Sequence, residues 1–359
     1  MCKRILASQT NTEGGVPFYK IGTIGNAPDA YISKELFDDY KTKYNYPHKG
    51  EVMITCAGTV GKCVIYNGKD AYYQDSNIVW IDNPSQCISN GFLFHLLAKV
   101  DWRKLNSTTI IRIYNDDLRN LKLSYPQIEE QQKISRLLSL LDERIATQNK
   151  IIEDLKKLKS AIIDYEINSL DSGFIKFSSL YEMAGEGGTP TTSNASFYDN
   201  GKIPFIKIDD LKKKYLTENK DFITELGLQK SSAWLVPTRS ILFSNGASIG
   251  EITITTYPVC TKQGILGIVP MPNVDVEFLY YFMSSSFFKK AVSRIVTEGT
   301  MKTAYLKDIN NILCPIPTKE EQQEIAKIPS ALNSKIDTEK SILKLFITQK
   351  QHLLHQMFI

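Results

Sequence analysis

The most regular segment of the chain begins with Tyr125-Pro126-Gln127-Ile128-Glu129-Glu130-Gln131-Gln132-Lys133-Ile134 and continues to about Asn168 without a glycine or a further proline. Apolar residues recur there at alternating steps of three and four, when Gln148 and Lys159 are counted as polar members of the series. This heptad pattern predicts a long helix that packs against another helix. A helix of about 38 residues would be roughly 57 Å long, which is longer than a compact domain needs. The apolar members of the series are Leu138, Leu141, Ile145, Ile152, Leu155 and Ile162.

The chain contains this segment twice, because Pro317 with Glu320-Glu321-Gln322-Gln323 repeats the Pro126 motif. Elements upstream repeat as well. Pro17-Phe18-Tyr19-Lys20-Ile21 matches Pro204-Phe205-Ile206-Lys207-Ile208, and Gly58-Thr59-Val60-Gly61 matches Ala247-Ser248-Ile249-Gly250. The offset between the copies stays between 186 and 191 residues, so an internal repeat spans the whole chain.

The second long segment keeps the heptad series of the first and begins with a capping box, Thr318 followed by Glu321. Two heptad helices separated by a globular domain bury their apolar sides most economically against each other, as an antiparallel pair. Separate packing of each helix on its own domain is the alternative. The expected contact residues of the second helix are Leu332, Ile336, Leu343, Phe346 and Leu353.

The predicted fold class is α+β, with two strand-rich domains that alternate with two long helices in a pseudo-twofold symmetric arrangement. Short β-type runs at 52–55, 63–66, 78–81, 204–208, 241–243 and 252–255 support the strands, and 91–98 and 278–288 are expected to be helical. The expected boundaries are 1–124 and 170–316 for the domains, and 125–169 and 317–359 for the helices.

Composition limits the class of protein. The net charge is only +4, so a nucleic-acid surface would depend on local clusters such as Lys212-Lys213-Lys214, Lys289-Lys290 and Lys41 with Lys43, each of which can equally be an ordinary solvated surface. Six scattered cysteines without CxxC spacing indicate reduced thiols in a cytoplasmic protein. The sequence shows no signal peptide and no apolar run long enough for a membrane span.

Motifs of catalysis are not apparent. Gly58-Thr59-Val60-Gly61-Lys62 is similar to a phosphate-binding loop, but Cys56 and Cys63 stand where that loop needs glycine and a hydroxyl residue. The repeat copy has Glu251 in place of Lys62, so a tight turn between strands is the better interpretation. The four histidines have no acid or cysteine at metal-ligand spacing, and no metal site is predicted. The joint absence of these motifs favours a binding module over an enzyme.

Polar loops occupy matching positions in the two halves. Residues 72–77, Tyr-Tyr-Gln-Asp-Ser-Asn, correspond to residues 260–264, Cys-Thr-Lys-Gln-Gly. Gln and Asn can make two hydrogen bonds to adenine, and Lys can contact guanine or phosphate. Equivalent loops with different side chains would let one scaffold recognise two different sequences, although ordinary hairpin loops explain any single residue as well.

The chain resembles the specificity subunit of type I restriction–modification systems over essentially its whole length. The resemblance rests on the pattern Pro-x-x-Glu-x-Gln-x-x-Ile at 126–134 and again at 317–325, on the Pro-Phe-x-Lys-Ile and Gly-x-x-Gly elements, and on Gly187-Gly188-Thr189-Pro190-Thr191. It implies a non-catalytic subunit that binds double-stranded DNA. Each strand-rich domain would be a target recognition domain for one half of a bipartite site, and the helical pair would set the spacer.

The resemblance also implies partners. Two modification subunits would carry AdoMet and methylate adenine, and restriction subunits would use ATP and Mg²⁺ to translocate and cleave DNA, so no cofactor is expected in this chain. A structural adaptor that joins two protein-binding domains without touching DNA is the alternative function. A stand-alone nuclease or methyltransferase is disfavoured because its motifs are not found.

One departure concerns the first domain. The second domain opens near Phe174-Ile175-Lys176-Phe177, well before its Pro-Phe-x-Lys-Ile element, whereas the matching opening of the first domain would precede Met1. We therefore expect the first domain to have a weakened edge and to depend on the assembly for stability. The residues expected to contact DNA are Lys20, Thr59, Lys62, Tyr73, Gln74 and Asn77 in the first half, and Thr189, Lys207, Lys212, Ser248, Lys262, Gln263 and Lys302 in the second.

Overall fold

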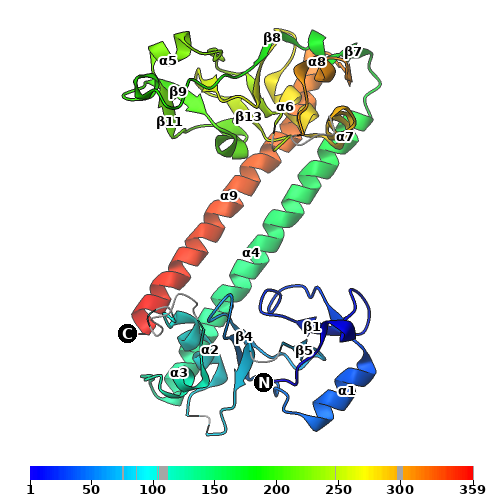
Figure 1. Ribbon diagram of the computed structural model, residues 1–359. Helices are drawn as coiled ribbons and strands as arrows, with labels where there is room; N and C mark the ends of the chain where they lie inside the picture. Colours follow the sequence, from blue (N-terminus) through cyan, green and yellow to red (C-terminus); the bar gives the residue numbers. More distant parts are fainter. Residues whose placement is uncertain are drawn as a thin grey trace. The chain divides into compact units, whose positions relative to one another are not determined.

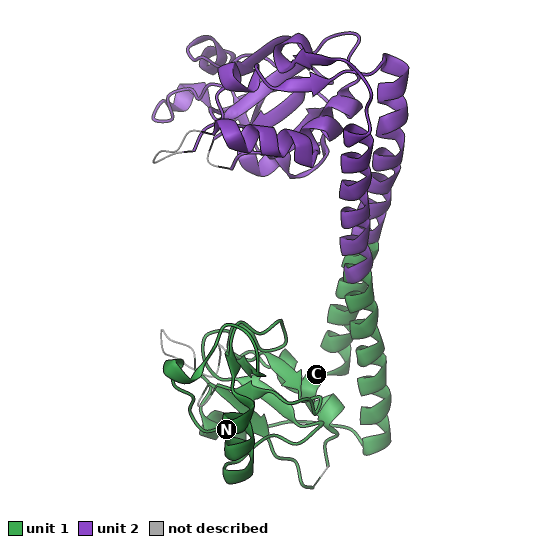
Figure 2. Ribbon diagram, turned by 90° about the vertical axis from the view of Figure 1, so that its right-hand side faces the viewer, with its two compact units in different colours: residues 1–149, 342–359 green, residues 150–341 purple. Residues whose placement is uncertain are grey.

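The computed structural model describes residues 1–74, 77–85, 87–102, 104, 112–246, 248–296 and 302–358. The chain divides into two compact units, which are coloured separately in Figure 2. Unit 1 comprises residues 1–149 and 342–359, and unit 2 comprises residues 150–341. Each unit contains one strand-rich domain together with a segment of both long helices.

The two long helices are α4 (Ile128–Asn168) and α9 (Lys319–Met357), which are labelled in Figure 1. Within unit 1, Lys350 forms an ion pair with Asp142. Within unit 2, the Lys159 Nζ donates to the Asn333 Oδ1 at 3.1 Å, and Ile163 and Ile325 share one apolar cluster. Residue numbers fall along α9 as they rise along α4, so the helices pair antiparallel in both units and the predicted fold class is confirmed.

The heptad residues lie on the contacting faces of the two helices. Leu138, Leu141, Ile152 and Ile336 are buried, and the other expected contact residues are half-buried. Gln148 and Glu339 are buried polar members of the same faces. No expected contact residue of either helix is exposed.

A buried glutamine fixes the start of each long helix. In unit 1, the Gln131 side chain accepts from the Ser89 backbone N–H at 2.8 Å and donates to the Cys87 and Pro126 carbonyls at 3.0 and 2.8 Å. In unit 2, Gln322 makes the equivalent bonds to the backbone of Asp275, Asn273 and Pro317. Ser89 and Asp275 are the N-caps of the helices that follow, so the glutamine joins the long helix to its domain.

Unit 2 is built around a five-stranded sheet with the order β10-β13-β12-β15-β8. Unit 2 also contains a three-stranded sheet with the order β11-β9-β14. A further pair is formed by β7 and β16, which are antiparallel. The strands are β7 (Phe174–Lys176), β8 (Tyr181–Glu186), β9 (Ile203–Ile206), β10 (Tyr215–Leu216), β11 (Asp221–Ile223), β12 (Ile241–Ser244), β13 (Ile252–Thr255), β14 (Cys260–Thr261), β15 (Ile265–Pro270) and β16 (Leu313–Pro315).

Unit 1 repeats the strands β13-β12-β15 and β11-β9-β14 of unit 2. Its sheets have the orders β4-β3-β6 and β2-β1-β5, and the β1–β5 pair is parallel like the β9–β14 pair of unit 2. No counterpart of β7, β8 or β10 is found among the described residues of unit 1. The strands are β1 (Val16–Tyr19), β2 (Tyr31–Ile32), β3 (Val52–Thr55), β4 (Cys63–Ile65), β5 (Tyr72–Tyr73) and β6 (Ile78–Ile81).

Shorter helices cover the sheets. The helix expected at 278–288 is in fact two helices, because Ser285 ends the first and caps the second by accepting from the Phe288 N–H at 3.2 Å. The helices are α1 (Lys34–Lys43), α2 (Asn90–Lys99), α3 (Asn115–Arg119), α5 (Glu225–Gln229), α6 (Val276–Ser284), α7 (Ser286–Ile295) and α8 (Leu306–Ile309), with 3-10 turns η1 (Ala7–Gln9), η2 (Phe177–Ser179), η3 (Ala195–Phe197) and η4 (Ile208–Lys212).

Candidate nucleic-acid interface

The same tight turn follows β3 in unit 1 and β12 in unit 2, each of which is the central strand of its sheet. In unit 1, the Thr55 hydroxyl donates to the Thr59 carbonyl and accepts from the Lys62 N–H at 3.0 Å. In unit 2, Ser244 donates to the Ser248 carbonyl and accepts from the Glu251 N–H at 2.8 Å. The hydroxyl therefore closes an exposed loop in both units, and the residue that follows the turn is a lysine in one and a glutamate in the other. This geometry is that of a strand-connecting turn rather than a phosphate-binding loop.

The turn requires glycine at its last position. Gly61 and Gly250 have φ angles of 85° and 106°, a region that residues with a Cβ rarely adopt. The sequence pattern Gly-x-x-Gly therefore marks a backbone conformation in this chain.

In unit 1, this turn and two further loops, which follow β1 and β5, lie together. The Gln74 N–H donates to the Tyr19 carbonyl at 2.9 Å, and the Gln74 Oε1 accepts from the Ile21 N–H at 3.3 Å. The Asn77 carbonyl accepts from the Cys56 N–H at 2.7 Å. The loops that follow β1, β3 and β5 are thus held together by two backbone hydrogen bonds and by the Gln74 side chain. The predicted residues Lys20, Thr59, Lys62, Gln74 and Asn77 come from these loops.

The corresponding loops of unit 2 meet in the same way. The Lys262 N–H donates to the Ile206 carbonyl at 2.9 Å, and the Gln263 N–H donates to the Thr189 hydroxyl at 3.4 Å. Asn245 accepts from the Ala304 N–H at 2.9 Å and so connects the turn with the segment that carries Lys302. The structure brings together Thr189, Ser248, Lys262, Gln263 and the Lys302 segment.

Gln74 and Lys262 occupy equivalent backbone positions in the two clusters. Each N–H donates at 2.9 Å to the residue that ends the facing strand, Tyr19 in unit 1 and Ile206 in unit 2. The backbone hydrogen bond is therefore the same in both units, whereas the side chain at this position differs. The sequence signal that could have identified this pair is the repeat alignment itself, which places Gln74 opposite Lys262.

Lysine side chains differ in how they are engaged. Lys20, Lys207 and Lys212 form ion pairs with Asp29, Asp221 and Asp209 at 3.2, 2.7 and 2.8 Å, all at exposed sites. Within the described part of the chain, no ion pair involves Lys62, Lys262 or Lys302. These three ammonium groups could therefore contact a phosphate without first releasing a carboxylate.

Tyr73 requires a correction, because the structure places it in the core. Its side chain is 5% exposed and its ring stacks on Tyr19 with centroids 5.9 Å apart. Burial also raises the pKa of its hydroxyl well above the usual range. The strand β5 needs an apolar inward face, so this ring packs the domain and does not offer a surface on which a base could stack.

The lysine clusters require a second correction. Lys214 is buried, where it pairs with Glu277 and donates to the Tyr281 and Ser330 hydroxyls at 2.9 and 3.0 Å. It therefore joins the domain of unit 2 to α9 rather than facing solvent. Lys41 and Lys43 pair with Asp70 and Asp39 at 3.1 and 2.5 Å.

A feature that sequence reasoning did not locate is a groove of about 290 Å³ beside the turn of unit 2. Ile249 and Gly250 form one wall, and α6 and α7 form the other through Met283 and Phe288. Lys289 and Lys302 stand at this groove, so one exposed member of the predicted Lys289-Lys290 cluster lies near the turn.

Several residues of the predicted loops and turns lie outside the described residues. Asp75 and Ser76 of the 72–77 loop and Ala247 of the repeated turn are among them. In the described part of the chain, no group of three or more His, Cys, Asp or Glu side chains could hold a metal ion. None of the helices that the structure describes is long and apolar enough to cross a membrane.

The sequence matches one protein family in two copies. The family model described as "Type I restriction modification DNA specificity domain" matches residues 1–157 and 171–345. A putative type I restriction enzyme specificity subunit of Haemophilus influenzae is 49% identical over 155 residues, which cover 43% of this chain and 40% of that protein. The putative MjaX specificity subunit of Methanocaldococcus jannaschii is 24% identical over 96% of this chain and 89% of that protein.

Solved structures give the same result for the fold. The type I restriction–modification S subunit from M. genitalium covers all of this chain and 92% of its own, with a TM-score of 0.61 and 20% identity. A chain from a study of complex assembly and conformational transition of the type I R-M system has a TM-score of 0.59 and covers 97% of this chain and 92% of its own at 15% identity. The chain therefore belongs to the family of type I restriction–modification DNA specificity subunits.

Proposed function

We propose that this chain recognises a bipartite site in double-stranded DNA, with the loop cluster of each unit contacting one half-site. The observation that carries the proposal is the pair of loop clusters with one backbone frame and different side chains. In the repeat, Gln74 corresponds to Lys262 and Lys62 corresponds to Glu251. The backbone N–H of each of these four residues donates to the equivalent acceptor in its own unit.

The side chains fit the chemistry of base recognition. Glutamine can bond adenine through two groups, lysine can bond the guanine acceptors or a phosphate, and glutamate can accept from the cytosine amino group. Because the two clusters present different members of this set, the two half-sites are expected to differ in sequence. The exposed lysines without ion pairs would supply the salt-dependent, sequence-independent part of the affinity.

The antiparallel pair of α4 and α9 would set the length of DNA between the half-sites. Both helices contribute residues to both units. Recognition of half-sites on a regular spacing is the general geometry of repeat-containing DNA-binding proteins.

The chain would act without catalysing a reaction of its own. We propose that it directs two modification subunits and the restriction subunits of a type I complex, and that AdoMet, ATP and Mg²⁺ are bound by those partners. The similarity to proteins described as putative type I restriction enzyme specificity subunits supports this assignment.

Gel retardation with the modification subunit present tests the proposal, using duplex DNA at several salt concentrations. The expected result is binding that weakens as salt rises, with slower loss for a subset of sequences. Loss of all binding, specific and non-specific alike, would contradict the proposal and favour a structural adaptor. The modification subunit without this chain is the control, because any retardation that remains belongs to the partner.

A further inference from the structure

Glu186 is a carboxylate that binds residues 262–264 of unit 2, which we call the reading loop. Its Oε1 accepts from the Gly264 N–H at 2.9 Å. The other two N–H groups of the reading loop donate to the Ile206 carbonyl at 2.9 Å and to the Thr189 hydroxyl at 3.4 Å. Each N–H group of the loop therefore has an acceptor on another segment of unit 2.

The reading loop is also held through a carbonyl group. The Gly264 carbonyl accepts from the N–H of Asn245, a residue that is 1% exposed, at 3.0 Å. Gly264 has a φ angle of 90°, which a residue with a Cβ rarely adopts, so the bend of the loop depends on glycine. These bonds fix the loop, and with it the position of the Glu186 side chain, before a ligand binds.

The Glu186 carboxylate retains one oxygen for a ligand. Glu186 is the last residue of β8, where it pairs with Leu266 of β15, and it is exposed. Within the described part of unit 2, ion pairs involve Glu218 and Glu277 but not Glu186. The bond to Gly264 uses Oε1, and no described residue donates to Oε2. The second oxygen can therefore accept a hydrogen bond from outside the chain.

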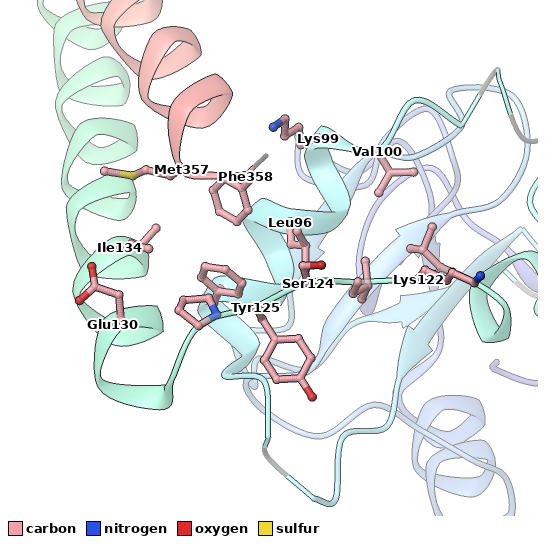
Figure 3. A pocket seen from close by; sticks show the side chains of 14 residues that line it. Leu96, Lys99, Val100, Lys122, Ser124, Tyr125, Glu130, Ile134, Met357 and Phe358 are labelled. Atoms are coloured by element: carbon pink, nitrogen blue, oxygen red, sulfur yellow. The ribbon is translucent and has the colours of Figure 1, made fainter.

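Glu130 of unit 1 shows how an exposed glutamate differs when no reading loop holds it. It lines a groove of about 630 Å³ together with Leu96 and Ile134, as Figure 3 shows. Its carboxylate forms an ion pair with Lys133 at 3.7 Å, and no residue of the unit 1 loop cluster lines this groove. Glu186, by contrast, is bound by the loop that carries Lys262 and Gln263.

The chemistry of a carboxylate limits what it can contact on DNA. A phosphate is repelled, because both groups are negatively charged. A carboxylate accepts hydrogen bonds and donates none, so it suits a base edge that offers a donor without an acceptor. In the major groove, cytosine presents its amino group alone, whereas adenine presents its amino group next to the N7 acceptor. The carboxylate therefore favours cytosine.

We propose that Glu186 is a specificity-determining residue of unit 2, whose Oε2 accepts from the amino group of one cytosine in the half-site. This inference rests on the proposed DNA recognition and adds a residue to it. The bond to Gly264 holds the carboxylate beside the reading loop, so Glu186 contacts the same half-site as Lys262 and Gln263.

Glu186→Gln tests the proposal in the full chain assembled with its modification subunits. The amide retains an oxygen for the Gly264 N–H and replaces the second carboxylate oxygen by a donor. Bound sites are selected from a random duplex library. At one position of one half-site, the enrichment of cytosine should fall by about fivefold or more, and adenine, which glutamine prefers, should rise. An unchanged set of enriched sequences would overturn the proposal.

Glu182→Gln is the matched control, because Glu182 is an exposed glutamate of the same strand. Both variants remove one negative charge and should raise the salt-dependent affinity equally, but Glu182→Gln should leave every base preference as in the wild type. The same change of preference in both variants would overturn the proposal, since a general effect of charge would then explain it.

Hydrogen exchange at 262–266 separates base recognition from support of the loop. Exchange in Glu186→Gln should be as slow as in the wild type, because the acceptor of the Gly264 N–H remains. Faster exchange together with altered preferences at several positions would show that Glu186 only supports the loop, and would overturn the proposal.

The wild-type selection distinguishes this inference from the proposed function. If the wild type and Glu186→Gln enrich the same bipartite site, the role of Glu186 is refuted and DNA recognition stands. A wild-type chain that enriches no sequence would overturn both proposals.

Discussion

Gln131 and Gln322 make the same three hydrogen bonds at the start of two helices, although they lie 191 residues apart in the chain. Both are buried, at 0% and 1% exposure. Each joins a long helix to the N-cap of the helix that covers its sheet. The repeated motif is thus a joint between a domain and a long helix.

Replacing either glutamine by alanine should destabilise its own unit by about 2–3 kcal/mol, because a buried N–H and two carbonyls lose their partners. The loss is measured as the change in the free energy of unfolding of each unit, with chemical denaturation monitored by hydrogen exchange in that unit. The neighbouring Gln132→Ala and Gln323→Ala are matched controls at exposed positions and should have little effect. Equal effects of the buried and exposed changes would contradict the role of the joint.

Lys214→Ala should destabilise unit 2 by about 3–5 kcal/mol, because it leaves Glu277 without its partner in a largely buried site. The double change Lys214→Met with Glu277→Leu should recover most of this loss, since neither charge then remains. Lys212→Ala removes an exposed ion pair and serves as the control. A double variant as unstable as Lys214→Ala would refute the assignment of the loss to an unpaired charge.

Stability of unit 1 should depend on pH through His95. Burial, and then the charge of Lys350, lowers the pKa of this imidazole from 6.5 to about 4, against an opposing effect of Asp142. The unfolded chain therefore binds a proton at a higher pH than the folded chain. The stability that depends on a neutral His95 is fully present above pH 6.5 and is lost as the pH falls towards 4. The free energy of unfolding then decreases by about 3 kcal/mol in all.

Denaturation of the wild-type chain and of His95→Leu between pH 7.5 and about 4 measures this contribution. The variant should show a shallower fall in the free energy of unfolding over that window. His352→Leu, at an exposed position of α9, should behave as the wild type. A steep fall that His95→Leu leaves unchanged would show that other groups cause the dependence.

Exchanging the side chains at the matched loop positions should exchange base preferences. Gln74→Lys and Lys262→Gln retain the backbone bonds to Tyr19 and Ile206, because those bonds use main-chain groups, although Gln74→Lys removes the acceptor of the Ile21 N–H. Each variant should change the preferred base at one position of one half-site by about 1–3 kcal/mol. Lys302→Ala, by contrast, should weaken binding uniformly and lower the salt slope by about one. A uniform loss in all three variants would show that the loop side chains do not read bases.

The sequence predicted the two long helices and the α+β fold class well, because heptad periodicity and a fixed repeat offset extend over the whole chain and do not depend on single contacts. It failed at Tyr73, where a residue suited to stacking on a base instead packs on Tyr19. It also failed at Lys214, since burial of a lysine depends on Glu277 and Ser330, which are distant in sequence. Such contacts arise from tertiary packing and leave no periodic trace in the sequence.

The spacer length should follow the length of the helical pair. Inserting one heptad in α4 after residue 149 and one in α9 before residue 342 preserves the a and d positions of both helices. The insertion adds about 10 Å of helix, which corresponds to about three base pairs. The matched control substitutes solvent-facing residues next to the two insertion points and leaves the length of both helices unchanged.

Selection of bound sites from a random duplex library is the most direct test of bipartite recognition. The chain is assembled with its modification subunits, and the enriched sequences are read for the wild type and the heptad variant. The account predicts two short specified segments at a fixed distance, with the same segments about three base pairs further apart in the variant. A single continuous site, or a spacer that does not respond to the insertion, would contradict it.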